Sequence, residues 1–266
     1  MQLTKEKQDL TRLSWSVNRN SLGIGGSFLK AYSELGGTKT YYKPSNFDKT
    51  RGIIGHECVN ELIVDRLLTI LGIPHLPYQL IHADVSVDGR THEVYLCASE
   101  DFKAKSESKT ALDAYKELEA LPDESALDFC IRMGWEDYIY QMLVVDYLIL
   151  NRDRHGANIE VLRNSRKKTI RLAPLFDHGN SLFNFAGTDA WADSTALEEY
   201  IETLYPSVYD DFLGTAKSVL TPELREKLRH LLTFHFKKHS RYNLPPKRLR
   251  MIEKQIQKRA GILLEH

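Results

Sequence analysis

The most informative stretch of the sequence is Asn151-Arg152-Asp153-Arg154-His155-Gly156-Ala157-Asn158, together with Phe176-Asp177-His178-Gly179 further along the chain. It sets an aspartate, an asparagine five positions on, and a second aspartate beyond a short strand pair. Phosphoryl transfer needs an oriented hydroxyl, a clamped triphosphate and neutralised charge. Asp153 can accept the hydroxyl proton, whereas Asn158 and Asp177 offer the oxygen ligands that Mg²⁺ prefers. The pattern predicts a site for ATP, Mg²⁺ and phosphoryl transfer.

A glycine-rich turn precedes this site by more than a hundred residues. Gly25, Gly26 and Ser27 can bring backbone N–H groups close to phosphate oxygens, although an ordinary hairpin turn would show the same glycines. Gly36-Gly37 then separates strand-like runs at 27–34 and 38–43. Lys43 ends the second run, because Pro44 cannot donate a ladder hydrogen bond. A lysine in this place could bind the α- and β-phosphates, or it could be a solvated edge lysine.

Residues 55–71 have the apolar spacing of an amphipathic helix, which Gly72 closes. Glu57 and Glu61 lie four residues apart and therefore share a face. Either could form an ion pair with Lys43, as in the small lobe of a kinase. Alternatively, both could be surface carboxylates favoured by the helix dipole. Spacing alone does not choose between the two glutamates.

Alternating residues at 78–87 and 92–98 predict a hairpin around Asp88-Gly89. With residues 1–20 as a polar lead-in, the first hundred residues should form about five strands and one helix. Ala98, Ser99 and Glu100 would begin the connector to the second half, and in a kinase this connector offers its backbone to adenine.

The second half is predicted to be mainly helical. A strongly apolar face over 136–150 marks a helix that leads into the opening motif, and a hairpin at 161–163 and 169–172 separates the two motifs. Further helices are expected near 109–120, 195–203, 208–219, 222–238 and 247–263. In the helix over 222–238, Thr221 is the expected N-cap and Pro222 takes the first helical position. The expected fold is α+β with two lobes, residues 1–100 and 101–266.

The motifs resemble the kinase core of HipA-like bacterial serine/threonine kinases. The resemblance rests on Asp153–Asn158, on 172–179, on the turn at 25–30, on Tyr42-Lys43-Pro44 and on the helix at 57–72. It implies a protein-kinase-like fold that uses ATP and Mg²⁺ to phosphorylate a serine or threonine of a protein. Asp153 is then the base, Asn158 and Asp177 are the metal ligands, and Lys43 binds the ATP phosphates.

Longer members of that family have a separate N-terminal subdomain, which we expect this chain to lack. The resemblance therefore leaves a toxin role and an antitoxin-type partner open. Some members phosphorylate a serine of their own glycine loop, and Ser21 and Ser27 are the candidates here.

Two residues of the opening motif keep alternative interpretations. The roles of Arg154 and His155 stay open. The string Asp-Arg-His-x-x-Asn also resembles phosphoinositide kinases, so His155 could act in catalysis or could simply brace the loop. A lipid or small-molecule kinase, or a nucleotide-binding pseudokinase that serves as an interaction module, therefore remains an alternative. His178 has no assigned role.

The composition restricts which partners and which cellular compartment we expect for the protein. Thirty-six basic residues balance thirty-six acidic ones, which argues against a nucleic-acid partner. A basic cluster near the end is more typical of a solvated face; it comprises Lys237, Lys238, Arg241, Lys247, Arg248 and Arg250. No apolar run reaches the length of a membrane helix. Three widely spaced cysteines fit a reducing cytosol and argue against a structural zinc or a disulfide frame.

Overall fold

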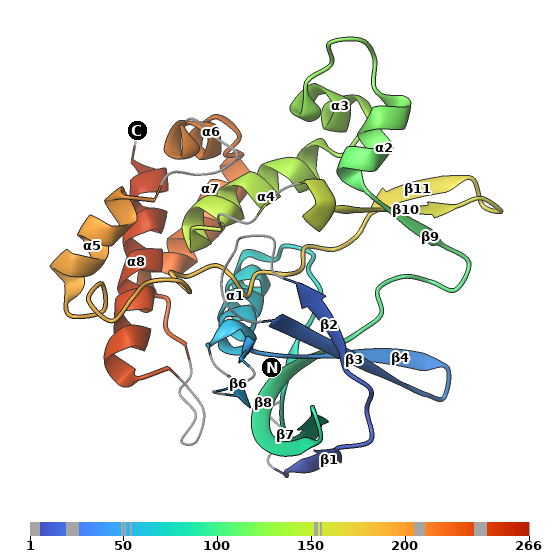
Figure 1. Cartoon of the computed structure of the whole chain (residues 1–266). Helices are drawn as coiled ribbons and strands as arrows, with labels where there is room; N and C mark the ends of the chain where they lie inside the picture. Colours follow the sequence, from blue (N-terminus) through green and yellow to red (C-terminus); the bar gives the residue numbers. More distant parts are fainter. Residues whose placement is uncertain are drawn as a thin grey trace.

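The computed structural model describes residues 6–19, 27–48, 50, 52–53, 55–151, 154, 156–204, 211–236 and 244–265. Within these ranges the first part of the chain forms a curled sheet with one helix, and the second part is mainly helical (Figure 1). The α+β class predicted from the sequence is confirmed.

The sheet of the first part is mostly antiparallel. Its elements are β1 (Gln8–Leu10), β2 (Ser16–Arg19), β3 (Ser27–Leu35), β4 (Thr38–Pro44), β5 (Phe47–Asp48), β6 (Gly52–Ile53), β7 (Gln79–Val87) and β8 (Arg90–Glu100). They follow the order β1-β7-β8-β4-β3-β5-β6, with β2 paired to β3, and β1 runs parallel to its neighbour β7.

The expectation of about five strands was wrong, since the described residues form an eight-stranded sheet. The polar lead-in at 1–20 contains β1 and β2, and two-residue strands β5 and β6 precede the helix. Strands of two to four residues are too short to show a period-2 pattern, which is why the sequence did not reveal them.

Turn chemistry explains why the two long hairpins were predictable. Gly36 and Gly37 adopt φ of 60° and 82°, and Asp88 and Gly89 adopt φ of 50° and 73°. Positive φ at both central residues is the mark of the turn type that matches the twist of paired strands. Strand β4 ends at Pro44, as the missing N–H predicts.

Helix α1 (Glu57–Leu71) closes on Gly72, whose φ of 62° is left-handed and whose N–H donates to the carbonyl of Leu68. The helix is buried on more than one side, including Glu57, at 7% exposure, and Glu61, at 3%. Burial rules out the alternative in which the two glutamates are surface carboxylates.

The second part holds a small sheet, ordered β11-β10-β9, and a set of helices. Its elements are β9 (Ser108–Ala111), α2 (Leu112–Glu119), α3 (Ala126–Arg132), α4 (Glu136–Ile149), the 3₁₀ turn η1 (Gly156–Asn158), β10 (Glu160–Asn164), β11 (Thr169–Leu172), α5 (Ser194–Glu202), α6 (Phe212–Ser218), α7 (Pro222–Leu228), η2 (Arg229–Thr233) and α8 (Pro246–Leu264).

Four helices differ from the prediction. The helix expected over 208–219 begins at Phe212, and residues 208–210 lie outside the described part of the chain. The helix expected near 109–120 starts at Leu112, because residues 108–111 pair with β10 as a strand. Helix α3 was not predicted. The helix expected over 222–238 begins with the Thr221 cap, which accepts from Leu224 N–H, but it ends at Leu228 and tightens into a 3₁₀ turn.

One apolar core runs through both parts of the molecule. Residues of α1 pack in the same cluster as residues of α4, α7 and α8, whereas a smaller cluster lies within the sheet and contains Phe47, Val85 and Leu96. The division at residue 100 therefore stays a prediction. Cys58, Cys97 and Cys130 are buried free thiols. None of the helices in the described ranges is both long and apolar enough to cross a membrane.

Candidate functional site

A cleft of about 250 Å³ lies between the sheet and the helical part. Strands β3, β4 and β8 supply one side, and β9, the η1–β10 region and the segment after β11 supply the other. The lining residues are Lys30, Tyr41, Lys43, Leu76, Tyr78, Ser99, Glu100, Asp101, Phe102, Lys103, Lys109, Asn158, Glu160, Phe176 and Asp177. Five residues predicted for the site are therefore together: Lys43, Ser99, Glu100, Asn158 and Asp177.

Lys43 and Asp177 meet across this cleft. The Lys43 Nζ lies 2.9 Å from Asp177 Oδ1, although the two residues are more than a hundred positions apart in sequence. Burial opposes the charged form of Lys43, but the Asp177 and Glu61 carboxylates outweigh it and raise the lysine pKa. The same lysine, against burial, lowers the pKa of Asp177. Both groups are thus charged at neutral pH.

The backbone at Asp177 has an unusual conformation for a residue with a side chain. Its φ is 63°, in the left-handed region that costs energy for any residue except glycine. Surrounding contacts hold it there: the Asp177 N–H faces the Tyr78 hydroxyl at 3.4 Å, and Leu76 N–H donates to the Leu175 carbonyl at 2.9 Å.

Glu61 is the helix carboxylate that serves this site. It accepts a hydrogen bond from His178 N–H at 3.0 Å, and the Gly179 N–H also lowers its pKa. Burial and the nearby Asp177 carboxylate nevertheless raise the pKa of Glu61 to about 7, against the opposing effect of Lys43. Glu61 therefore acts on Lys43 through space, while the direct ion partner of Lys43 is Asp177.

Glu57 has a different role. Its carboxylate accepts from the Asn46 N–H at 3.2 Å and from Asn184 Nδ2 at 3.0 Å. It thus joins α1 to the end of β4 and to the segment after Asp177, and the expectation that it might pair with Lys43 is wrong. A Cβ at Gly179 would lie 3.1 Å from Glu57 Cβ, so a glycine lets this segment approach the helix closely.

Asn60 and His178 complete the contact between α1 and the segment after Asp177. Asn60 Nδ2 donates to the carbonyls of Gly179 and Ser181 at 2.9 and 3.2 Å. His178 is buried at 2% exposure, and burial together with the Arg154 charge lowers its pKa well below the ordinary value. His178 is therefore a neutral packing residue beside the metal-binding aspartate predicted from the sequence.

Arg154, whose role the sequence left open, braces the loop. Its Nε and Nη2 donate to the two oxygens of Asp146 in α4 at 2.9 and 3.1 Å, and both side chains are almost fully buried. Its Nη1 also faces the Phe176 carbonyl at 3.4 Å. Asn151 Nδ2 donates to Asp146 as well, at 3.0 Å. The opening motif is thus fixed to the helix before it and to the residue before Asp177.

The sequence reasoning missed three lysines that line the cleft, Lys30, Lys103 and Lys109. Ala31 pairs with Tyr42, so one step further along the same antiparallel register Lys30 lies opposite Lys43. Burial and the Lys43 charge lower the pKa of Lys30. Lys109 lies on β9 and pairs with Glu160 at 2.8 Å. The hairpin predicted around Gly36-Gly37 already places Lys30 opposite Lys43. Two lysines that face each other repel unless an anion lies near them, so this pairing could have indicated an anion site.

The connector begins later than expected. Ala98, Ser99 and Glu100 belong to β8 and pair with Tyr42, Tyr41 and Thr40 of β4, because the strand alternation continues to Glu100. Ala98 is buried in the sheet core and does not line the cleft, whereas Ser99 and Glu100 do. Strand β7 begins at Gln79, which pairs with Ala98, so the β8 backbone beyond Ala98 has no β7 partner.

Several predicted residues lie outside the described part of the chain. These are Asp153 and His155, the turn residues Gly25 and Gly26, and Ser21. Ser27 is described as the first residue of β3, through its backbone. Among the described residues no group of three His, Cys, Asp or Glu side chains converges as a metal site. Asn158 and Asp177 both line the cleft, and two oxygen donors suit Mg²⁺, which commonly completes its shell with water and phosphate oxygens.

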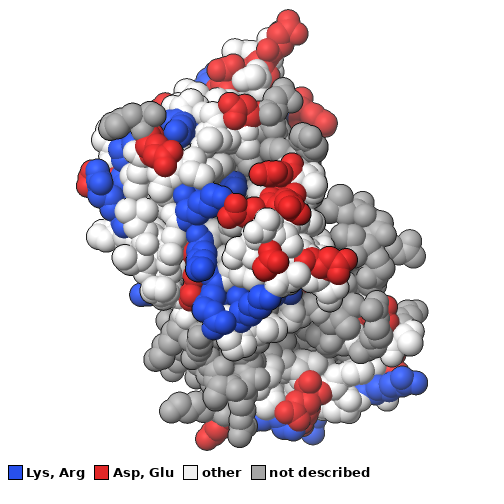
Figure 2. All heavy atoms as spheres, turned by 90° about the vertical axis from the view of Figure 1, so that its left-hand side faces the viewer, with Lys and Arg blue, Asp and Glu red and all other residues white. Residues whose placement is uncertain are grey.

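Charge on the outer face of the helical part is mixed. Figure 2 shows Lys and Arg gathered beside Asp and Glu on the side that carries α5 and α8, where Lys258 pairs with Glu198 at 2.9 Å. Lys247 and Arg250 are exposed, as expected of a solvated face. Arg248 differs, because its guanidinium packs over the Trp191 ring at 4.1 Å. Lys237, Lys238 and Arg241 lie outside the described residues.

No protein-family model matches the chain, and no curated protein matches its sequence. Solved structures do match. The fold is similar to that of the Helicobacter pylori proinflammatory kinase CtkA, with a TM-score of 0.63 and 17% identity over 97% of each chain. A second match is a chain in the structure of the Shewanella oneidensis MR-1 toxin–antitoxin system HipA, HipB and its operator DNA. There the TM-score is 0.47 and the identity 12%, over 90% of this chain and 64% of the other. The CtkA match confirms the two-lobed, kinase-like fold.

Proposed function

We propose that the protein is an ATP-dependent kinase that phosphorylates a serine or threonine hydroxyl of a protein. The observation that carries the proposal is the meeting of Lys43 and Asp177 in one cleft that Asn158 also lines. A strand lysine and a carboxylate from the opposite lobe, beside an amide oxygen, are the groups that phosphoryl transfer requires. The kinase-like fold supports this proposal.

Lysines from both sides of the cleft could contact a triphosphate. Lys30 and Lys43 face each other on β3 and β4, and Lys109 lines the far side. Burial and the Lys43 charge disfavour the charged form of Lys30, so a bound polyphosphate would stabilise that charge. Ser99 and Glu100, whose backbone lacks a β7 partner, are placed to bind the adenine edge.

Asn158 and Asp177 would hold Mg²⁺, which would neutralise charge developing on the phosphate oxygens. Asp153 is proposed to accept the proton of the attacking hydroxyl. That oxygen then bonds to the γ-phosphorus as the bond to the β,γ-bridging oxygen breaks, and ADP leaves. Arg154 and Asp146 would fix the loop on which Asp153 lies, so that little reorganisation is needed during transfer.

The direct test is incubation with γ-labelled ATP and Mg²⁺, with the protein itself, a mixture of bacterial proteins, and lipid vesicles as acceptors. We expect label on serine or threonine after acid hydrolysis of the protein acceptors. Asp177→Asn should abolish transfer, and Asp153→Ala should lower it by about 10³-fold or more, as expected when both proton transfer and orientation of the nucleophile are lost.

The control is Asp189→Asn, which removes an exposed carboxylate of the segment after Asp177 and should label at the wild-type rate. Label confined to lipid would refute the protein acceptor. ATP binding without transfer to any acceptor would instead identify a nucleotide-binding interaction module. Full activity in the Asp153→Ala variant would refute the assignment of that residue.

A further inference from the structure

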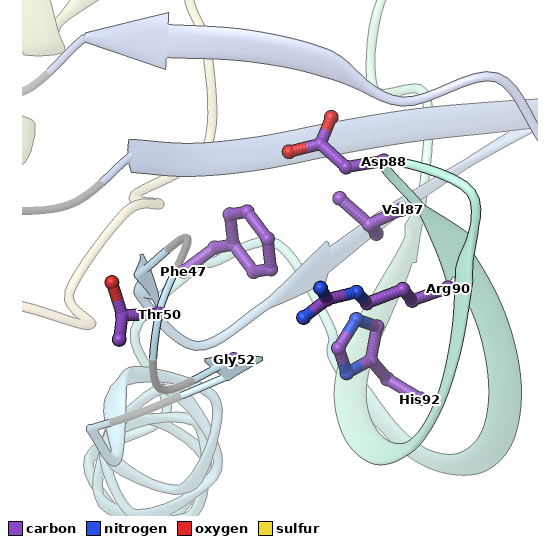
Figure 3. A pocket seen from close by; sticks show the side chains of 7 residues that line it. All are labelled: Phe47, Thr50, Gly52, Val87, Asp88, Arg90 and His92. Carbon is purple, nitrogen blue, oxygen red and sulfur yellow. The ribbon is translucent and has the colours of Figure 1, made fainter.

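A second pocket lies in the sheet part, where the turn of the β7–β8 hairpin approaches β5 and β6. It encloses about 290 Å³ and shares no lining residue with the cleft. Figure 3 shows the Arg90 guanidinium and the His92 imidazole lying close together and directed toward Phe47 and Thr50. This volume is near the lower limit of about 300 Å³ for ligand pockets, so the occupant must be small.

The strand pattern makes Arg90 and His92 unusual. Side chains at alternate positions share a face of a strand, and on β8 Val94, Leu96 and Ala98 all point into the apolar core of the sheet. Arg90 and His92 continue that inward face at the end where the hairpin extends past the core. The inward face of β8 thus changes from apolar to basic at this end, where His92 is half-buried and Arg90 is exposed.

Neighbouring carboxylates do not neutralise them. On the same hairpin, Asp84 pairs with Lys7 at 2.9 Å, and Glu93 pairs with His82 at 2.7 Å. Within the described ranges Arg90 makes no ion pair. Asp88 is the single carboxylate of the lining, and it is exposed on the hairpin turn.

The rest of the pocket positions the imidazole of His92. The His92 ring packs edge-on against Phe47, with ring centroids 6.0 Å apart. Gly52 has a φ of 78°, and a Cβ there would lie 3.5 Å from His92 Nδ1, so β6 passes close to the imidazole. Thr50 adds a hydroxyl on the opposite wall, while its N–H donates a hydrogen bond to Asp48 Oδ1 at 2.9 Å.

We propose that this pocket binds the phosphate group of a small phosphomonoester. A guanidinium fork, an imidazole N–H and a hydroxyl are three separate donors, and they match the three terminal oxygens of a phosphomonoester better than the two of a carboxylate. Asp88 at the mouth would accept from a hydroxyl or ammonium group of the organic part. The inference is independent of the proposed kinase activity, because no residue of the cleft takes part.

The test follows the His92 ring signals by ¹H–¹³C NMR during titration with inorganic phosphate, O-phosphoserine or acetate at constant ionic strength. The His92 signal is identified by its loss in His92→Gln. We expect a saturable shift with both phosphate compounds, with phosphoserine binding at least as tightly as inorganic phosphate. Arg90→Gln should weaken binding by about tenfold or more, since a hydrogen bond to a charged group contributes about 1.5–3 kcal/mol.

Arg66→Gln is the matched control, because Arg66 is exposed on α1 and its loss removes the same charge outside the pocket. It should bind phosphate like the wild type, and Arg90→Lys should restore only part of the affinity lost in Arg90→Gln. Equal affinity in wild type and Arg90→Gln, or no saturable shift of His92, would overturn the site. Acetate binding as tightly as phosphate, or phosphoserine binding more weakly, would overturn the assignment of a phosphomonoester.

Discussion

Replacing Glu61 with glutamine should change how the stability of the protein depends on pH. Glu61 is 3% exposed, and burial beside Asp177 raises its pKa from the ordinary 4.5 to about 7. In the unfolded chain the carboxyl loses its proton near pH 4.5, while in the folded protein it keeps the proton until about pH 7. Between these values the folded state binds more protons, so the free energy of unfolding falls as pH rises.

The size of the effect follows from the two pKa values. One pKa unit corresponds to about 1.4 kcal/mol, so ionising Glu61 in the fold costs roughly 3 kcal/mol over the whole window. Between pH 5 and pH 8 the contribution is about 2.5 kcal/mol. Glutamine keeps the acceptor for the His178 N–H but carries no charge at any pH.

Urea unfolding of both proteins at pH 5, 6, 7 and 8 gives the measurement. Relative to wild type, Glu61→Gln should gain about 2 to 3 kcal/mol as the pH rises from 5 to 8. Burial lowers the pKa of His56 and His178, so wild type and Glu61→Gln both lose stability in acid. This loss is common to the two proteins and cancels when their free energies of unfolding are subtracted. Glu117→Gln, at an exposed position of α2, is the control and should follow the wild-type curve. A difference between Glu61→Gln and wild type that stays constant across pH would refute the reasoning.

Three further predictions concern the loop, the cleft and a helix end. Arg154→Ala leaves the buried Asp146 carboxylate without its partner and should lower the free energy of unfolding by about 3–5 kcal/mol in urea, a loss of under about 1 kcal/mol being the contrary result. Lys30→Gln removes the charge facing Lys43, so calorimetry should show ATP binding about tenfold weaker. The melting temperature without ATP should stay equal or rise, because the repulsion between the two lysines is removed, and a lower melting temperature would contradict that repulsion. Gly72→Ala places a side chain at a φ of 62° and should cost about 1 kcal/mol in urea unfolding, and an unchanged midpoint would mean that the left-handed cap is not required.

The sequence predicted those parts of the fold that local chemistry determines. Asp88-Gly89 requires positive φ and so sets the β7–β8 hairpin, and Gly72 ends α1 because only glycine adopts a left-handed cap at little cost. Strands β5 and β6 are different, since two residues contain no period, and their pairing depends on where β3 places its edge.

The candidate site also combines residues that the sequence predicted with residues that it did not predict. Asp177 and Asn158 were predictable because their spacing and residue types carry the chemistry, and the cleft contains both. The choice between Glu57 and Glu61 was not predictable. The two share a helix face, and only the docking of α1 against residues 178–184 decides which carboxylate points toward Lys43. Lys30 shows that strand register, once predicted, could have been used to identify a residue of the site.

The continuous core has a consequence for how this protein divides into folding units. Ile63, Leu67 and Leu71 of α1 are all fully buried, and they belong to the cluster that also contains residues of α4 and α8. The same cluster contains Leu80 of β7 and Cys97 of β8, so α1 is buried against both parts, and we expect hydrogen exchange to protect α1, β7, β8 and the helices as one cooperative unit. In this protein the helix that presents Glu61 to the cleft is thus anchored on both sides of it, and an opening motion would have to break contacts of α1 with one part or the other.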